Sequence, residues 1–232
     1  MTKRMKKVSN GIDVSYHQGL IDWEKVKPHI GFAMIRAGYG MNTVDAKFER
    51  NASECERLNI PYGVYWFSYA KSAQQAAIEA QRCLAVIKGK KLSFPVVFDY
   101  EYDSDEKALK AGYLINNTDR YNIAKTFLEV IENAGYYAML YANKDYMSKG
   151  FEKLCERYDL WLAHWTDNIE PYRNCGIWQW TSKGKVDGIT GFVDLNISYK
   201  DYPSFIQKEH NNTLIDKLKK LYQEFGEILK DL

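Results

Sequence analysis

The stretch that decides the fold is Phe94 to Asp103, which reads FPVVFDYEYD. Its β-branched and aromatic residues are typical of a buried strand, and Pro95 lies near the start, where a strand tolerates proline. Because side chains alternate along a strand, Val97, Asp99 and Glu101 are expected to share one face. Two carboxyl groups would then point the same way from the end of an otherwise apolar strand.

These two acids have two interpretations. A buried charge is costly unless it is paired or used. If Asp99 and Glu101 face a cleft, desolvation and mutual repulsion would separate their pKa values, leaving one group as an acid and the other as a carboxylate. Alternatively, the strand runs out into solvent and both are ordinary surface acids. The spacing alone leaves both interpretations open.

Composition narrows the class of protein. The chain has 232 residues, is 46% hydrophobic and carries a formal charge of +2. This length suits one substantial core of the α/β-barrel type, and the near-neutral charge gives no argument for nucleic acid. No apolar run approaches the ~20 residues of a membrane helix. The basic residues in 1–10 are not followed by the apolar stretch of a signal peptide.

Two residue types add to this picture. The four cysteines are scattered without a CxxC spacing, which predicts neither a metal site nor a disulfide framework. Aromatic residues make up 15% of the chain, with 18 Tyr and 6 Trp. Tyr and Trp offer flat apolar faces with a polar handle, on which sugar rings can stack. A carbohydrate cleft is one explanation, and large core aromatics are the other.

The order of predicted elements indicates a barrel. Strands are expected at 11–17, 31–39, 60–70, 94–103 and 137–143, with helices at 22–30, 45–58, 73–87 and 121–133. This alternation implies parallel strands joined by crossover helices. Helices become sparse afterwards, while three more strands are expected at 158–165, 175–182 and 192–197. We therefore predict a flattened, incomplete (β/α)8-type barrel with eight strands and reduced helices in its second half.

Such a barrel would gather polar residues from distant parts of the sequence. In β/α barrels the active site lies at the C-terminal ends of the strands. The polar residues in or at the ends of predicted strands include Asp13, Arg36, Asp99, Glu101, Trp165 and Asp194. Their convergence is a stronger argument for a site than any one of them.

The chain divides into three predicted parts. Residues 1–10 form a basic arm, 11–206 the barrel, and 207–232 an amphipathic helix. Within that helix the apolar residues follow a 4-3-4-3-4 spacing and form a broad stripe: Leu214, Leu218, Leu221, Phe225, Ile228 and Leu232. A broad stripe usually docks on a core, so docking on the barrel is expected. Self-association through 214–232, or the start of a wall-binding element, is the alternative.

Separated motifs resemble one family. In order, they are GIDVSYHQG, FAMIRAGYG, IPYGVYWFSYA, PVVFDYEY, YDLWLAHW, IWQWT and GFVDLN, within about residues 11–206. Together they resemble glycoside hydrolase family 25, the lysozymes that cut peptidoglycan. The resemblance implies a barrel with reduced helices and N-acetylmuramidase activity on the glycan strands of bacterial peptidoglycan. It implies cleavage of the β-1,4 bond from N-acetylmuramic acid to N-acetylglucosamine, with no metal or other cofactor.

The resemblance also implies roles for four acids. Glu101 is the general acid that protonates the leaving oxygen, and Asp99 beside it orients or charges the acetamido group of the substrate. Asp13 and Asp194 complete the acidic cluster. These residue types fit the chemistry, because glycoside cleavage needs one protonated carboxyl and one charged group. A cluster of acids would raise at least one pKa and keep Glu101 protonated near neutral pH.

Further residues are expected around the acids. Tyr65, Tyr141, Trp165 and Gln179 are predicted sugar contacts, and Arg36 is predicted to bind substrate and tune the acids. Each also has a structural interpretation. The aromatic residues could fill the barrel, Gln179 could satisfy a backbone group, and Arg36 could be the structural partner of Asp13 or Asp194.

Two other functions stay open. One is a non-catalytic peptidoglycan-binding barrel, although a protein that only binds gains nothing from keeping four acids that repel one another. The other is a different N-acetylhexosamine-cleaving glycosidase of the chitinase type, against which the IDVS and VDLN motifs favour the muramidase. For any of these functions, the start of the chain suits a cytoplasm-made phage-type lysin released at lysis, or a secreted protein whose signal was removed.

Overall fold

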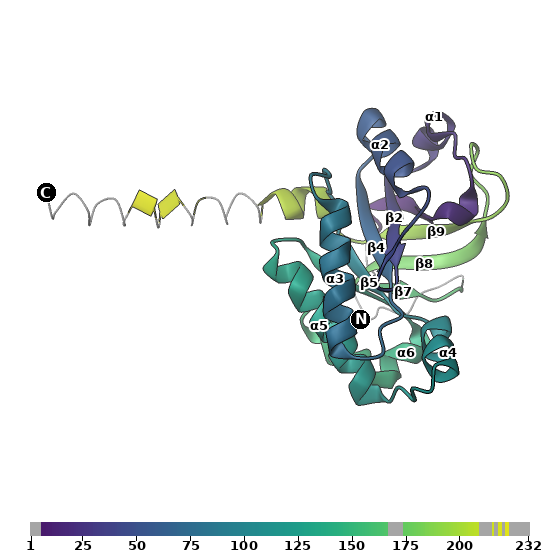
Figure 1. Cartoon of the computed structure of the whole chain (residues 1–232). Coiled ribbons are helices and arrows are strands. Elements are labelled where there is room, and N and C mark those ends of the chain that lie inside the picture. The colour runs from purple at the N-terminus through teal and green to yellow at the C-terminus, as the bar shows by residue number, and fades with distance from the viewer. Residues whose placement is uncertain (1–5, 167–173, 209–214, 216–217, 220, 223–232) are drawn as a thin grey trace, which may run out of the picture.

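The computed structural model describes residues 6–166, 174–208, 215, 218, 219, 221 and 222 (Figure 1). Its strands are β1 Ser9–Val14, β2 Phe32–Tyr39, β3 Thr43–Val44, β4 Tyr62–Phe67, β5 Val96–Asp99, β6 Ala138–Asn143, β7 Asp159–Ala163, β8 Cys175–Gly184 and β9 Val193–Ser198. Its α-helices are α1 Trp23–Val26, α2 Phe48–Leu58, α3 Ala73–Ile87, α4 Tyr102–Lys110, α5 Asn117–Asn133 and α6 Lys144–Tyr146.

Eight of these strands close into a barrel. The order is β1-β9-β8-β7-β6-β5-β4-β2, and pairing between β1 and β2 closes the ring, while β3 extends from β2. The predicted eight-stranded, barrel-type fold is confirmed. One strand breaks the parallel pattern, because β9 runs antiparallel to both β1 and β8. The link at 185–192 is shorter than the dozen or so residues that a parallel crossover needs, so the chain must turn back.

The helices cover one side of the barrel. In Figure 1, α3 and α5 lie side by side, α2 lies above them, and β8 and β9 lie on the far side without a long helix. Between β6 and β9 the described helical segments are single turns, such as Lys144–Tyr146 and Leu154–Glu156. The prediction of reduced helices in the second half is therefore confirmed for the described residues.

Strand β5 follows the predicted alternation. Val97 packs inside the barrel with side chains of the opposite strands, whereas Phe98 packs outward, with its ring centroid 5.2 Å from that of Phe127 in α5. Asp99, the last residue of the strand, is 4% exposed. The predicted strand 94–103 was too long, because Glu101 is the N-cap of α4. Acidic residues in the first turn of α4 are the signal that could have predicted this helix.

The barrel interior has no room for a side chain at Gly63 in β4. A Cβ atom there would lie 2.5 Å from the Pro95 carbonyl oxygen and 2.7 Å from Phe94 Cβ, neither of which can rotate away. We expect Gly63→Ala to lower the free energy of unfolding by about 1–3 kcal/mol, as overpacking does. Urea unfolding measures it. Gly31→Ala is the control, because the close contact of its Cβ is with the movable hydroxyl of Ser9. Equal unfolding midpoints for the two variants would contradict the prediction.

The predicted terminal parts are described only in places. The arm at 1–10 is partly taken up by β1, which begins at Ser9. Most of the predicted helix at 207–232 lies outside the described residues. Ile215, Leu218, Leu221 and Tyr222 are helical and 49–84% exposed, so the barrel does not cover these four side chains. No helix in the described part of the chain is long and apolar enough to cross a membrane.

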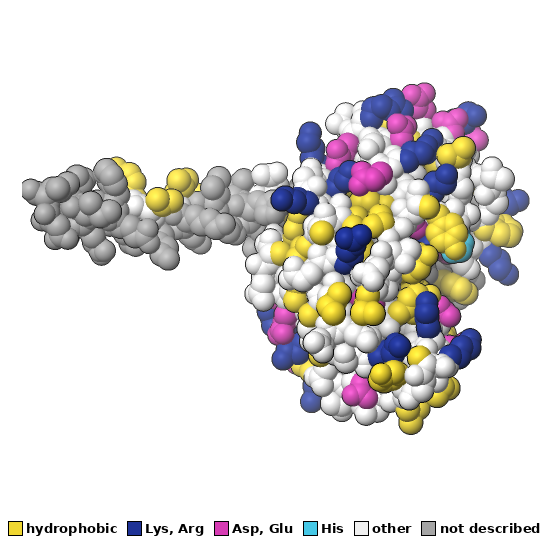
Figure 2. Space-filling view, in the orientation of Figure 1, with side chains coloured by type: hydrophobic (Ala, Val, Ile, Leu, Met, Phe, Trp, Pro, Cys, Tyr) yellow, Lys and Arg dark blue, Asp and Glu magenta, His cyan; other side chains and the backbone are white. Residues whose placement is uncertain are grey.

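The surface carries charges of both signs. On the face drawn in Figure 2, Lys and Arg side chains are interspersed with Asp and Glu side chains. This mixture agrees with the formal charge of +2 on the whole sequence.

Candidate active site

One cavity collects all the predicted site residues. Its volume is about 330 Å³, and it opens where the parallel strands end. The residues predicted from the sequence that line it are Asp13, Arg36, Tyr65, Asp99, Glu101, Tyr141, Trp165, Gln179 and Asp194. The prediction that the barrel brings these distant residues together is confirmed as geometry.

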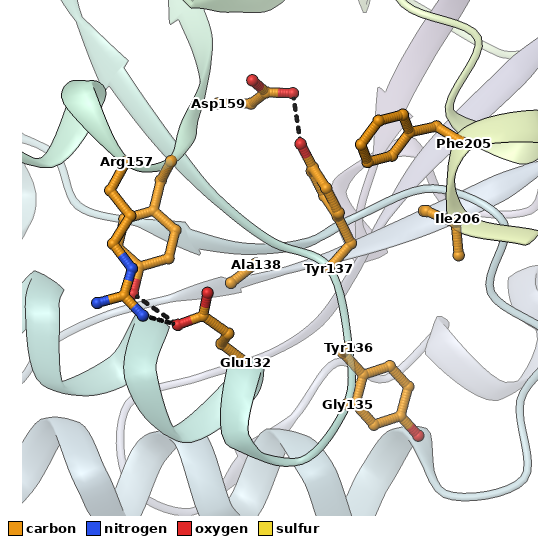
Figure 3. Close-up of a pocket in the computed structure, with 10 residues that line it drawn as sticks. Glu132, Gly135, Tyr136, Tyr137, Ala138, Arg157, Asp159, Phe205 and Ile206 are labelled. Carbon is orange, nitrogen blue, oxygen red and sulfur yellow. Dashed lines mark hydrogen bonds and ion pairs between the residues drawn. The ribbon is translucent and has the colours of Figure 1, made fainter. Parts of the chain in front are cut away.

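A larger cavity, of about 430 Å³, lies at the opposite end of the barrel, where β6 and β7 begin (Figure 3). Its charged groups are already engaged. Glu132 pairs with Arg157, and Asp159 accepts hydrogen bonds from Tyr137 Oη at 2.9 Å and Lys200 Nζ at 2.6 Å. Carboxyl groups held in this way stabilise the barrel end and are poor candidates for proton transfer. We therefore take the smaller cavity as the candidate active site.

Asp99 and Glu101 come from the end of β5 and the start of α4. Oδ1 of Asp99 is buried and has no hydrogen-bond partner among the described residues. Burial and the nearby charge of Glu101 raise the pKa of Asp99 well above its ordinary value. Burial, then the charges of Asp13 and Asp103, raise the pKa of Glu101 from 4.5 to about 7. At neutral pH Glu101 is therefore poised to give up a proton.

Asp13 and Asp194 face each other across the antiparallel pair of β1 and β9. Asp13 Oδ2 accepts hydrogen bonds from Gln179 Nε2 at 3.0 Å and from Asn196 Nδ2 at 2.8 Å. Burial raises the pKa of Asp13 to about 6, although these bonds oppose the rise. Burial, then the charges of Asp13 and Glu101, raise the pKa of Asp194 to about 8. The cluster therefore holds fewer negative charges at pH 7 than it has carboxyl groups.

Gln179 ties the acids to the aromatic residues. Its Oε1 accepts hydrogen bonds from Tyr141 Oη at 3.3 Å and Trp165 Nε1 at 3.2 Å, while its Nε2 donates to Asp13. These bonds are to side chains, so the interpretation of Gln179 as a backbone partner is not needed. Trp165 is 64% exposed at the rim, whereas Tyr65 is buried in the cavity wall. An exposed ring at the rim is available for stacking.

Arg36 has a different partner from those considered in the sequence. Its Nε lies 2.9 Å from Asp45 Oδ2, so the interpretation as a partner of Asp13 or Asp194 is wrong. The guanidinium carbon also lies 5.0 Å from the centre of the Tyr16 ring. Nη2 is buried without a hydrogen-bond partner among the described residues. The positive charge of Arg36 lowers the pKa of Asp99, against the larger effect of burial.

Sequence reasoning missed three supporting residues. Asn196 holds Asp13, and Trp161 Nε1 donates to Asn196 Oδ1 at 2.8 Å, which turns the amide nitrogen toward the acid. The alternation rule could have found Asn196, since it shares a face with Asp194. Asp45 carried no such signal, because it was the first residue of a predicted helix, and its bond to Arg36 joins residues nine positions apart in the chain.

The raised pKa of Asp194 predicts that replacing this acid stabilises the fold at high pH but not at low pH. An acid whose pKa is raised by folding loses stabilisation as the pH rises from its unfolded value, 3.8, to its folded value, about 8. We expect Asp194→Asn to raise the free energy of unfolding by about 2 kcal/mol at pH 8.5 and to leave it unchanged at pH 4. Urea unfolding at both pH values measures this.

The control for this experiment is Asp187→Asn, which changes an exposed acid in the link before β9. It should alter stability little at either pH. A gain for Asp194→Asn that is the same at pH 4 and pH 8.5 would show that the charge of Asp194 carries no penalty in the fold.

Metal ligation was not predicted for this site. Within the described ranges, no group of three or more His, Cys, Asp or Glu side chains is arranged to hold a metal ion.

Comparison with known proteins finds relatives both in sequence and in structure. "Uncharacterized protein YegX" of Escherichia coli K12 is 27% identical over 198 residues, covering 81% of this chain and 68% of the relative. "Lysozyme M1" of Streptomyces globisporus is 25% identical over 203 residues, covering 80% and 66%. The structure of the modular autolysin LytC from Streptococcus pneumoniae, in complex with a synthetic peptidoglycan ligand, matches with a TM-score of 0.72 and 27% identity.

The structural match covers 82% of this chain and 46% of LytC, so this chain spans about half of that protein's length. A family model gives the decisive assignment. The model of glycosyl hydrolases family 25 matches residues 12–189, which include Asp13, Asp99 and Glu101. Asp194 lies just beyond the matched region, yet β9 brings it to the same cavity. The family resemblance of the sequence motifs is confirmed, and this chain belongs to glycosyl hydrolases family 25.

Proposed function

We propose that this protein is a lysozyme that hydrolyses the β-1,4 bond between N-acetylmuramic acid and N-acetylglucosamine in bacterial peptidoglycan. The observation that carries the proposal is the raised pKa of Glu101, about 7, in a cavity shared with three other acids. Similarity to Lysozyme M1 and to LytC, whose structure is known in complex with a synthetic peptidoglycan ligand, supports this substrate. The protein would act at the bacterial cell wall.

Glu101 supplies the proton in this mechanism. Protonation of the glycosidic oxygen lets the leaving sugar depart as an alcohol, while positive charge builds on the sugar ring that remains. A pKa of about 7 keeps a large share of Glu101 protonated near neutral pH. After the sugar leaves, the Glu101 carboxylate can take a proton from the incoming water.

Asp99 supports the developing positive charge. Its buried Oδ1 has no hydrogen-bond partner among the described residues and is free to accept the N–H of the substrate's acetamido group. Held in this way, the acetamido oxygen can attack the anomeric carbon and form a cyclic intermediate, which water then opens. Arg36 favours the ionised form of Asp99 through its charge.

The remaining residues shape the site. The charges of Asp13 and Asp103 help to hold Glu101 in its protonated form, and Glu101 in turn helps to raise the pKa of Asp194. Trp165 offers an exposed ring to a sugar at the rim, and Gln179 links it to Tyr141. Tyr65 packs edge-on against Trp161, with ring centroids 5.9 Å apart, and closes the wall. We assign sugar contacts to Tyr65, Tyr141, Trp165 and Gln179, and substrate binding with tuning of Asp99 to Arg36.

The test is the identity of the new reducing ends. Purified protein is incubated with defined peptidoglycan, the products are reduced with borohydride, and the ends are identified by mass spectrometry. Reduced muramic acid ends support the proposal. Reduced glucosamine ends would assign a glucosaminidase instead, and binding to the wall without any new ends would assign a non-catalytic barrel.

A further inference from the structure

Glu79 is a buried acid outside the cavity. It lies on α3 and is 0% exposed. Its Oε2 accepts a hydrogen bond from Ser68 Oγ at 2.6 Å, and its Oε1 accepts one from the backbone N–H of Tyr69 at 3.0 Å. A fully buried carboxyl group is costly and rare unless it is paired or hydrogen-bonded. Glu79 therefore holds the segment that follows β4 against α3.

Ser68 connects Glu79 to the end of β5. Its backbone N–H donates to the carbonyl oxygen of Asp99 at 2.8 Å. Its own carbonyl oxygen accepts a hydrogen bond from Ser104 Oγ at 2.7 Å. Ser68 and Ser104 are 0% and 1% exposed, so water does not compete for these bonds.

Ser104 completes the connection to Glu101. Its Oγ accepts the backbone N–H of Glu101 at 3.1 Å, as a helix N-terminus requires. Glu101 lies beyond the last residue of β5, so no strand ladder fixes its backbone. A continuous set of hydrogen bonds thus runs from Glu79 through Ser68 and Ser104 to Glu101.

We propose that Glu79 is a positioning residue, which fixes the Asp99–Glu101 turn through Ser68 and Ser104. The proposal rests on the proposed function, in which Glu101 is the general acid. A displacement of about 1 Å far from the reacting atoms can cost about 10²-fold in rate, because the reacting groups must be aligned. The charges that raise the pKa of Glu101 are those of Asp13 and Asp103, so Glu79 would act through geometry.

The test compares four variants on a soluble peptidoglycan fragment. Glu79→Ala removes both bonds to the segment after β4, and Ser104→Ala removes both bonds at the start of α4. We expect each to lower kcat about 10–100-fold with KM within about threefold of wild type. Glu79→Gln can still accept from Tyr69 N–H and donate to Ser68 Oγ. It should therefore stay within about fivefold of wild type.

Ser198→Ala is the matched control. Ser198 is also 0% exposed, and its Oγ donates to a backbone carbonyl, that of Lys200, at the same 2.7 Å, but at the opposite end of the barrel. It should lower the melting temperature about as much as Ser104→Ala while keeping the wild-type kcat. An equal loss of kcat in Ser198→Ala, or wild-type kcat in folded Ser104→Ala and Glu79→Ala, would overturn the proposal.

A second measurement does not depend on activity. The titration of the Glu101 carboxyl is followed by ¹³C NMR in wild type, Glu79→Ala, Ser104→Ala and Ser198→Ala. If the network positions Glu101, its apparent pKa shifts in the first two variants and not in Ser198→Ala. If wild type cleaves no peptidoglycan but this pattern holds, the proposed function fails while the positioning role stands. Unchanged titration in all variants overturns the positioning role.

Discussion

Glu101→Gln is expected to lower kcat on peptidoglycan by about 10²- to 10⁴-fold, which is the usual contribution of one general acid. The amide has the size of the carboxyl group, but its N–H protons are not acidic enough to be transferred to the glycosidic oxygen. Binding should change little, because the side chain remains neutral, as the protonated acid is. Initial rates of reducing-end release measure the loss, and wall pull-down measures binding.

The control for this variant is Glu106→Gln on the same helix. Glu106 is exposed, and its Oε2 lies 3.3 Å from Lys110 Nζ on the same helix. It should keep wild-type activity. If Glu101→Gln retains more than about a tenth of the wild-type rate, Glu101 is not the proton donor.

The pH dependence of the wild-type enzyme follows from the same group. The acid form of Glu101 is the active form, and its pKa is raised from 4.5 to about 7. Activity should therefore be lost at low pH, where Asp99 is protonated, and should fall as the pH rises through 7, where Glu101 loses its proton. A profile of kcat/KM against pH reports this pKa in the free enzyme. Activity that stays constant up to pH 9 would contradict the assignment.

Asp99→Asn is expected to have the second-largest effect, a loss of about 10²- to 10³-fold in kcat, as when a group placed to stabilise transition-state charge is removed. The amide fits the same space but carries no negative charge to oppose the charge on the sugar ring. The substitution should also raise the free energy of unfolding near pH 8, because the pKa of buried Asp99 is raised and its ionisation is penalised. Urea unfolding and initial rates measure both effects.

The role of Asp99 can be separated from that of a nucleophile. Asp99→Ala leaves a space that a small anion can enter. If Asp99 were the nucleophile, added azide would restore the rate and leave a glycosyl azide product. If the acetamido group of the substrate attacks, as proposed, azide should give no such recovery. Mass spectrometry of the products decides between these outcomes.

Local patterns predicted much of the site because strands fix the direction of side chains. The alternation in FPVVFD put Val97 and Asp99 on one face and Phe98 on the other, and in the structure Asp99 lines the cavity while Phe98 packs against Phe127 of α5. Glu101 lines the cavity together with Asp99, as predicted. Its direction is set by its place as the N-cap of α4 and not by the strand. Apolar periodicity gives no boundary where a helix begins directly after a strand, so the start of α4 could have been inferred only from the acidic residues of its first turn.

Long-range pairings were not predictable from local patterns. Arg36 pairs with Asp45 across a loop, and nothing in the spacing chose Asp45 over the acids of the cluster. The antiparallel course of β9 could have been inferred from the short link at 185–192, which leaves no room for a crossover helix. The roles proposed for Arg36, Tyr65, Tyr141, Trp165 and Gln179 stay predictions, although all of them line the cavity.

The closure of the barrel by β1 and β9 sets when the enzyme can first become active. Asp13 is held by Gln179 and Asn196, which follow it by 166 and 183 positions along the chain. Contacts this distant in sequence form slowly, because the entropy cost of closing a long loop comes before the contacts can stabilise the fold. A nascent chain on the ribosome therefore has no complete acid cluster until β9 has emerged. Chains that end before β9 should therefore be inactive.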